Sequence, residues 1–370
     1  MEKSVVAFAP GRAELLGNHT DYNEGLVLAA AIDLGITIRA EKIDADVIKV
    51  ISEANRREVS ISAKNLQRLE EEPWANYPIG VIKSLREAGF EIGGVQLRVG
   101  SNLPVGSGLS SSAAFEVATA VAALELFDFR VEPMVLAQLC QKAENEFVGV
   151  RCGLLDQASS VFGKEDEVIL LDFRATTART VPLSPNVALL LVDSGVPHQL
   201  TGGEYNERRT QCQAAAEALG VKALRDTTSE VVSSSSLDSL IRARALHITG
   251  ENERVLAGVV ALESGQMQKF GQLMFQSHES SKLNFQNSTA FLDALVQIAA
   301  TIQGVLGARL TGGGFGGSTI WLVEKNKAPE ILRRVSEAYH LKTGATCRAL
   351  ITKASQGARL VEENRPNRDR

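Results

Sequence analysis

Hydrophobic and polar positions alternate along several short stretches of the chain and repeat at helical spacing along others. Alternation is typical of half-buried strands, and a repeat of about three to four residues is typical of amphipathic helices. Strands are predicted at residues 4–10, 94–99, 167–172, 187–192, 318–323 and 345–351. Helices are predicted at residues 74–88, 114–124, 136–147, 237–300 and 328–339, with a serine-rich surface turn at 229–236. The pattern by itself indicates a mixed α and β protein.

Residues 103–114 form a glycine- and serine-rich turn between a predicted strand and a predicted helix. Gly106 and Gly108 allow backbone amides to approach a ligand closely. Serines 110–112 stand where a helix leaves its first N–H groups unpaired, at the positive end of its dipole. The turn therefore predicts a phosphate-binding loop. An ordinary serine-capped helix after a glycine turn is the alternative, because serine is a common helix cap.

A dense group of polar residues follows the first predicted strand. Residues 11–23 interrupt the alternation before an apolar stretch at 27–38, and they contain Arg12, Asn18, His19 and Asp21. Each side chain taken singly fits a solvated loop. Because they stand so close together in the sequence, we expect a polar loop between two strands that contributes to a site.

Two carboxylates later in the chain are further candidates. Glu144 falls between the apolar helical positions Cys140 and Phe147, so its side chain leans toward the interior. An ionised carboxylate is costly to bury alone, so Glu144 needs a cation, a metal ion or access to water, and a lysine or arginine partner is the structural alternative. Asp156 precedes a short helical run, where an aspartate is often only a helix cap.

Composition and charge exclude several classes of protein. With 370 residues, 44% hydrophobic and 22% charged, the chain is expected to fold as a soluble globular protein without a membrane partner. No secretory signal is recognised, so a cytoplasmic location is expected. The four cysteines form no Cys-x-x-Cys pair, which argues against a zinc site or a disulfide framework. A net charge of −5 argues against nucleic-acid binding.

Two of these segments resemble a known family. Residues 104–113 match Pro-x-x-x-Gly-Leu-Ser-Ser-Ser-Ala, the phosphate loop of the GHMP kinases. Residues 11–23 are similar to the galactokinase motif Gly-Arg-x-x-x-x-Gly-Glu-His-Thr-Asp-Tyr-Asn, except that Asn18 replaces the glutamate. Galactokinase-like segments recur at residues 141–157, 204–209 and 311–317, whereas residues 280–285 depart from the family pattern.

The resemblance implies a fold and an arrangement of domains. We expect the α+β, two-domain GHMP kinase fold, with the active site in the cleft between the domains. Residues 1–195 would form the N-terminal domain with the phosphate loop, and residues 196–370 a ferredoxin-like C-terminal domain. The glycine-rich residues 311–317 would wrap the substrate, although a β-bulge is the alternative.

The resemblance also implies an activity, the transfer of phosphate from MgATP to the C1 hydroxyl of galactose or a close galacto-configured sugar. It implies a catalytic role for Asp156 and Arg12. Sugar binding would fall to Asn18, His19, Asp21, Gly153 and Tyr205. ATP would contact Gly106, Ser107, Gly108, Leu109, Ser110, Ser111, Ser112 and Trp74, and Mg²⁺ would be bound by Ser112 and Glu144.

Alternatives to galactose phosphorylation remain open at this point. One is a GHMP-type kinase for a pentose, an amino sugar or a uronic acid, which the departure at Asn18 permits. The other is a non-catalytic sugar sensor, although such relatives lose the Ser-Ala end of the loop that this chain keeps at Ser112 and Ala113. Asn18 would accept a sugar hydroxyl more weakly than glutamate, so Asn18→Glu is expected to tighten galactose binding. The oligomeric state is open, and a monomer is compatible with the sequence.

Overall fold

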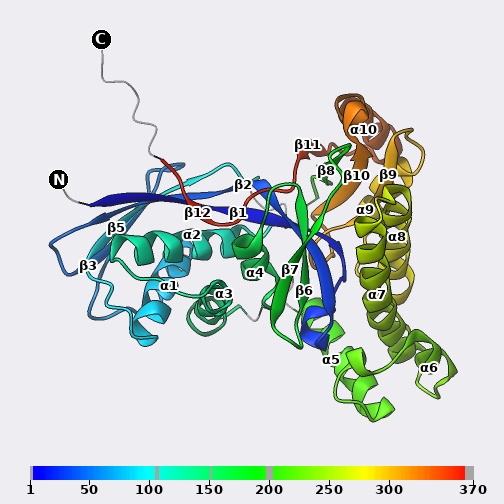
Figure 1. Ribbon diagram of the computed structural model, residues 1–370, viewed down its shortest axis with the longest axis horizontal. Coiled ribbons are helices and arrows are strands. Elements are labelled where there is room, and N and C mark those ends of the chain that lie inside the picture. Colours follow the sequence, from blue (N-terminus) through cyan, green and yellow to red (C-terminus); the bar gives the residue numbers. More distant parts are fainter. Residues whose placement is uncertain (1–2, 105–107, 151, 197–202, 363–370) are drawn as a thin grey trace.

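The computed structural model describes residues 3–104, 108–150, 152–196 and 203–362. Two β-sheets organise this part of the chain, one with eight strands and one with four. In Figure 1 the larger sheet extends to the left above α1, α2 and α3, and the smaller sheet lies at the right beside a group of long helices. The fold is the two-domain α+β fold expected from the resemblance to GHMP kinases.

The larger sheet has the strand order β12-β1-β2-β5-β3-β4, with β6 pairing to both β2 and β7. Its pairs are antiparallel except for β3 with β5, which is parallel. The strands are β1 (Ser4–Leu16), β2 (Leu26–Lys42), β3 (Val47–Ser52), β4 (Glu58–Ser62), β5 (Val95–Ser101), β6 (Glu167–Asp172), β7 (Thr177–Pro182) and β12 (Arg359–Leu360).

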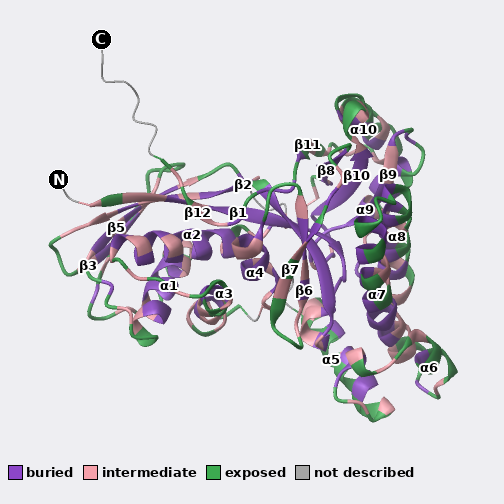
Figure 2. Cartoon of the chain, viewed as in Figure 1, coloured by how far each residue is buried: buried purple, intermediate pink, exposed green. Residues whose placement is uncertain are grey.

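Helices cover one face of this sheet. They are α1 (Asn76–Glu87), α2 (Ser111–Leu126), α3 (Pro133–Lys142) and α4 (Leu155–Phe162). The buried side of α2 is rich in alanine, including Ala114 and Ala118, and these small side chains let the helix pack closely on β1 and β2. In Figure 2 most of α2 is coloured as buried. The backbone N–H of Arg12 in β1 also donates to Leu109 O at 3.2 Å, which holds the segment just before α2 against β1.

The smaller sheet is ferredoxin-like. Its strands are β8 (Val187–Asp193), β9 (Val305–Leu310), β10 (Ser318–Glu324) and β11 (Arg348–Thr352), and their spatial order is β11-β8-β10-β9 with antiparallel pairing. Helices separate β8 from β9 and β10 from β11, as in the βαββαβ motif. The helices of this half are α5 (Gly203–Leu219), α6 (Ser229–Ser234), α7 (Ser239–Glu263), α8 (Met267–Ser280), α9 (Ala290–Ala299) and α10 (Ala328–Thr343). Trp321 and Tyr339 are fully buried in the core formed with α9 and α10.

Two predicted elements differ from the observed ones. The first strand does not end at residue 10, because Arg12 and Glu14 continue to pair with Ala31 and Ala29 of β2. Gly11 lies within this strand rather than in a turn, and a Cβ there would stand 2.6 Å from Leu109 O. The expected surface turn at 229–236 is instead helix α6, capped by the Thr228 side chain.

The expected division at residue 195 stays a prediction. Strand β8 precedes that residue but belongs to the smaller sheet, and β12 follows it but pairs with β1.

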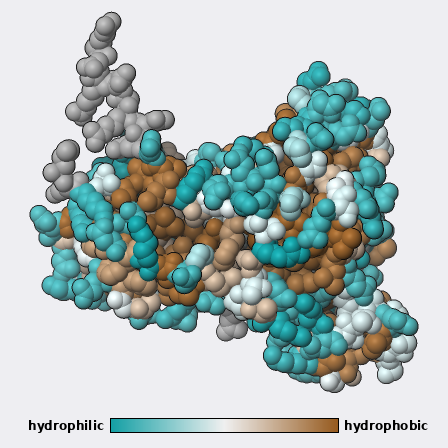
Figure 3. All heavy atoms as spheres, in the orientation of Figure 1, coloured by the Kyte–Doolittle hydropathy of each residue, from teal (hydrophilic) through white to brown (hydrophobic). Residues whose placement is uncertain are grey.

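Hydrophilic residues predominate over α10, and hydrophobic residues show mainly in the middle of the face drawn in Figure 3. Among the described residues no helix combines the length and apolarity needed to cross a membrane.

Candidate active site

A cavity of about 700 Å³ collects most of the residues predicted from the sequence. Its wall comes from β1 and the loop after it, from the N-termini of α2 and α4, from the start of α5 and from the loop before β10. The lining residues include Arg12, Glu14, Asn18, His19, Asp21, Gly108, Leu109, Ser110, Ser111, Ser112, Glu144, Cys152, Gly153, Asp156, Tyr205, Gly312 and Gly313. Segments distant in the sequence therefore meet at one site.

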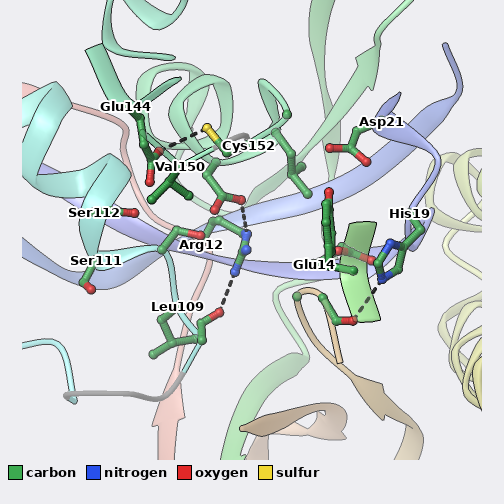
Figure 4. A pocket seen from close by; sticks show the side chains of 18 of the residues that line it. Arg12, Glu14, His19, Asp21, Leu109, Ser111, Ser112, Glu144, Val150 and Cys152 are labelled. Carbon is green, nitrogen blue, oxygen red and sulfur yellow. Dashed lines mark hydrogen bonds and ion pairs between the residues drawn. The ribbon is translucent and has the colours of Figure 1, made fainter. Parts of the chain in front are cut away.

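Arg12 and Asp156 form an ion pair in this cavity. Arg12 Nε donates to Asp156 Oδ1 at 2.8 Å, and Arg12 Nη1 donates to Gly108 O at 2.8 Å. The Arg12 side chain is 7% exposed and that of Asp156 is 26% exposed, so the carboxylate remains open to a ligand. Figure 4 shows Arg12 between the side chains near Ser112 and those near Asp21. The guanidinium thus links the phosphate-loop end of the cavity to Asp156.

The phosphate loop leads directly into α2. Ser110 has a left-handed backbone with φ 59° and makes no side-chain cap, and its buried Oγ has no hydrogen-bond partner among the described residues. Ser111 and Ser112, at the start of α2, line the cavity, and among the described residues no side chain caps the first N–H groups of this helix. This arrangement is suited to an anion. The predicted contacts Gly106 and Ser107 lie outside the described residues.

Glu144 is buried in a π-helical segment, Ala143–Val148, with 4% of its surface exposed. Cys152 Sγ donates to its Oε2 at 3.2 Å and Gln157 Nε2 donates at 2.7 Å. In the described part of the chain no lysine or arginine pairs with it, so the structural alternative of an ion pair is not found there. Burial raises the pKa of Glu144, the nearby Asp156 raises it further, and hydrogen bonds from Cys152 and Ser112 oppose the shift.

These residues fit a magnesium ion held partly by water and phosphate. Within the described ranges, no group of three or more His, Cys, Asp or Glu side chains is arranged to hold a metal ion. Glu144 and Ser112 instead offer one carboxylate and one hydroxyl at the N-terminal end of α2. Mg²⁺ commonly binds through one or two carboxylates plus substrate phosphates and waters. A carboxylate without a cationic partner at this position is therefore suited to it.

Asp21 and Gly153 meet at the other end of the cavity. A Cβ added to Gly153 would stand 1.8 Å from Asp21 Oδ2, so only glycine leaves room for that carboxylate. Burial raises the pKa of Asp21 to about 7, and the neighbouring carboxylates of Glu14 and Asp156 add to the shift. Asp21 therefore changes its charge near neutral pH.

His19 is a neutral part of the wall. Burial lowers the pKa of His19 to about 4. Its Nε2 lies 2.9 Å from Gly313 O and its Nδ1 lies 2.9 Å from the Tyr22 hydroxyl. Because a carbonyl oxygen can only accept, Nε2 carries the proton and Nδ1 accepts from Tyr22. The ring centre of Tyr205 lies 5.1 Å from that of His19, so the two aromatic side chains form one surface of the cavity.

The amide of Asn18 is occupied by protein partners. Its Nδ2 donates to Glu14 Oε1 at 3.0 Å and to Gly312 O at 2.8 Å. Its Oδ1 accepts from Asn287 Nδ2 at 2.8 Å, and Ser281 Oγ lies 3.5 Å away. The sequence-based role of Asn18 as a direct acceptor for a sugar hydroxyl stays a prediction, and these contacts weigh against it.

The third glycine-rich segment forms part of the wall. Gly312, Gly314, Gly316 and Gly317 all have positive φ, so the segment turns in ways that other residues rarely allow. Gly312 and Gly313 carbonyls accept from Asn18 and His19, which joins the loop to the segment after β1. The loop is therefore a cavity wall rather than a mere bulge in β10.

One residue predicted to bind a ligand lies outside the cavity, and two residues of the candidate site were not predicted from the sequence. Trp74 does not line this cavity; its Nε1 donates to Glu72 Oε2 at 2.5 Å, and its contact with adenine stays a prediction. Glu14 lines the cavity but was missed, because an acidic residue near a strand gives no sequence signal of burial. Gln157 was also missed; its Nε2 bridges Glu144 and the buried Glu116. Burial raises the pKa of Glu116 to about 10.

Comparison with known proteins first defines the class. The family model for the GHMP kinases N terminal domain matches residues 76–164, and that for the GHMP kinases C terminal domain matches residues 259–341. A mevalonate kinase from Methanococcus jannaschii shares the fold with a TM-score of 0.71 at 18% identity, covering 96% of this chain and 99% of that chain. The fold is that of a GHMP kinase.

More similar relatives define the family within that class. The galactokinase galactose-binding signature matches residues 1–42. A galactokinase from Roseiflexus sp. (strain RS-1) is 40% identical over 367 residues, which cover 97% of this chain and 94% of the relative. The crystal structure of Lactococcus lactis galactokinase complexed with galactose superposes with a TM-score of 0.92 at 32% identity, covering 96% of this chain and 95% of that chain. The chain belongs to the galactokinase family, whose members are phosphotransferases acting on a sugar hydroxyl.

Proposed function

We propose that this protein transfers the γ-phosphoryl group of ATP to the C1 hydroxyl of galactose, giving galactose 1-phosphate and ADP. The observation that carries the proposal is the Arg12–Asp156 pair, which opens into the same cavity as the N-terminus of α2. The similarity to galactokinases, one of them crystallised with galactose, supports the choice of sugar.

The chemistry asks mainly for positioning and for stabilisation of negative charge. Asp156 would accept a hydrogen bond from the C1 hydroxyl, orienting its oxygen toward the γ-phosphorus and accepting the proton as the O–P bond forms. Arg12 would stabilise the negative charge that develops between the hydroxyl and the phosphate, since it already contacts Asp156 and Gly108 O. The uncapped amides of α2 would hold phosphate oxygens.

Ser112 and Glu144 are the residues that would hold Mg²⁺ together with phosphate oxygens and water. When bound, the ion would neutralise charge on the β- and γ-phosphates. Gln157 and Cys152 would keep the Glu144 carboxylate oriented, because both donate to its Oε2.

Asp21, Gly153, His19 and Tyr205 would hold the sugar. Asp21 in its ionised form would accept hydrogen bonds from sugar hydroxyls, and Gly153 leaves the space that its carboxylate occupies. His19 and Tyr205 would offer an apolar ring surface to the sugar. The sensor alternative is less favoured because Ser112, Arg12 and Asp156 are all present. The cytoplasmic location stays a prediction.

The proposal is tested by measuring ADP release with MgATP over a panel of aldoses. We expect galactose to give the highest kcat/KM, with little release for glucose. Binding of galactose and ATP without turnover would instead identify a sensor. Preference for a pentose, an amino sugar or a uronic acid would identify a kinase for a different acceptor.

A further inference from the structure

Glu14 is an acidic side chain in the cavity wall. It has no role in the proposed catalytic step or in the proposed phosphate site. It lies on β1, and the pairing of β1 with β2 is in continuous register from Arg12 to Glu14. Residues two apart on a strand point to the same face, about 7 Å apart. Glu14 therefore stands on the same side of β1 as Arg12, displaced by roughly the width of a sugar ring.

The Glu14 carboxylate is held in place through one of its oxygens. Its Oε1 accepts from Arg309 Nη1 at 2.9 Å and from Asn18 Nδ2 at 3.0 Å. Arg309 is 0% exposed, and its Nε and Nη2 have no hydrogen-bond partner within the described residues. The Glu14 backbone N–H donates to Thr311 Oγ1 at 2.8 Å. These contacts fix the carboxylate against the ferredoxin-like half of the molecule.

The second oxygen of the carboxylate is not used by the protein. Across the described ranges no hydrogen bond reaches Glu14 Oε2, and this oxygen is not among the buried polar atoms left without a partner. Glu14 nevertheless belongs to the cavity wall. In Figure 4 it lies with His19 and Asp21, on the side of Arg12 away from Ser111 and Ser112. A free carboxylate oxygen at this place is suited to accept a hydroxyl.

We propose that Glu14 is a specificity-determining residue whose Oε2 accepts a hydrogen bond from a sugar hydroxyl distant from C1. Asn18 and Arg309 position this carboxylate by holding its other oxygen. The inference rests on the proposed function, because it takes the sugar to lie between Asp156 and Glu14. It also changes the expectation for Asn18→Glu, which would bring a second carboxylate beside Glu14 and weaken sugar binding.

The test compares the effect of Glu14→Gln on galactose with its effect on analogues that each lack one sugar hydroxyl. KM and kcat are measured for galactose and for its 2-, 3-, 4- and 6-deoxy analogues, with wild type and Glu14→Gln. We expect Glu14→Gln to raise the KM for galactose about 10- to 100-fold, because a charge-assisted hydrogen bond is lost, while the KM for ATP stays unchanged. For one analogue lacking a hydroxyl distant from C1, the same substitution is expected to have almost no effect.

Two further variants keep the test decisive. If Glu14→Gln fails to fold because Arg309 loses its partner, Glu14→Asp keeps the charge but withdraws the carboxylate by one methylene, and the same comparison is made. Glu263→Gln is the control, because Glu263 of α7 pairs with Arg179 at the surface and does not line the cavity. Its effect on KM is expected to be equal for galactose and every analogue.

The outcomes separate this inference from the proposed function. An equal loss for galactose and all deoxy analogues would mean that Glu14 only supports the structure, and no change in KM would mean that it does not meet the sugar; either overturns the inference. A wild-type protein that phosphorylates no aldose would overturn the proposed function and this inference together. A galactose kinase without the Glu14 effect would overturn this inference alone.

Discussion

Asp156 is the residue on which the proposed chemical step depends most. It pairs with Arg12 on one side and remains partly open to the cavity on the other. An aspartate in this position can orient and deprotonate a hydroxyl, whereas a helix cap would contact its own backbone amides. The observed partner is the Arg12 guanidinium, which favours the catalytic interpretation.

Asp156→Asn is expected to lower kcat by about 10² to 10⁴, because asparagine keeps the shape but accepts no proton. KM values for galactose and ATP should change little. Steady-state kinetics with Asp128→Asn as an exposed control would test this. Activity above about a tenth of the wild-type rate would remove Asp156 from the chemical step.

Glu144→Gln is expected to raise the Mg²⁺ concentration needed for half-maximal activity, because it removes the carboxylate expected to bind the metal. The control is Glu146→Gln, in the same π-helical segment but 67% exposed at its side chain. Titration of activity with Mg²⁺ compares the two variants. The same Mg²⁺ requirement in Glu144→Gln and wild type would show that Glu144 does not bind the metal.

We expect sugar binding to depend on pH through Asp21. Its pKa is raised to about 7, so the carboxylate becomes ionised, and a stronger acceptor for hydroxyls, as pH rises from 6 to 8. The KM for galactose is expected to fall over that range in wild type and to stay flat in Asp21→Asn. An identical pH profile in both proteins would exclude Asp21 as the titrating group.

The raised pKa of Asp21 also makes the stability of the folded protein depend on pH. Whereas sugar binding is expected to strengthen as pH rises, this contribution to stability weakens. Because the folded pKa of Asp21 exceeds the unfolded one, its contribution to stability is greatest below about pH 4 and is lost as pH rises through about 7. The difference in melting temperature between wild type and Asp21→Asn should therefore shift in favour of the variant as pH rises.

At the scale of elements, helix α7 supports the loop that follows β1. Glu251 of α7 is fully buried, and its Oε2 accepts from Gly17 N at 2.8 Å and from Asn18 N at 2.9 Å. Its Oε1 accepts from Arg254 Nε at 2.6 Å. Burial alone would raise the pKa of Glu251, but Arg254 and the neighbouring donors lower it well below its usual range. The carboxylate is therefore an ionised anchor for the loop that follows β1.

Glu251→Gln is expected to lower stability by about 3 to 5 kcal/mol, since it breaks a buried ion pair. Glu263→Gln is the control on the same helix, because the surface pair of Glu263 with Arg179 is worth at most about 1 kcal/mol. Chemical denaturation measures both differences. Equal stabilities for the two variants would mean that α7 does not anchor this loop.

At the scale of the whole molecule, the sequence predicted the fold and many of the residues that line the cavity, because its motifs are local. The phosphate loop and the polar residues after β1 are contiguous, and helical spacing alone predicted that Glu144 points inward. Glu14 could not be predicted, because its burial depends on Arg309, far along the chain. The contacts of Asn18 with Gly312 and Asn287 are likewise set by tertiary structure. The extension of β1 past residue 10 depends on pairing with β2, which overrides the local glycine signal.

The position of the phosphate on the product tests the central claim most directly. Purified protein is incubated with MgATP and galactose, and the product is examined by two-dimensional ¹H–³¹P NMR. We predict a single new sugar phosphate whose phosphorus couples to the C1 proton, formed at least about 100-fold more slowly in a parallel reaction with Asp156→Asn. A phosphorus signal coupled to any other sugar proton, or ADP formed without a sugar phosphate, would contradict the placement of C1 at Asp156.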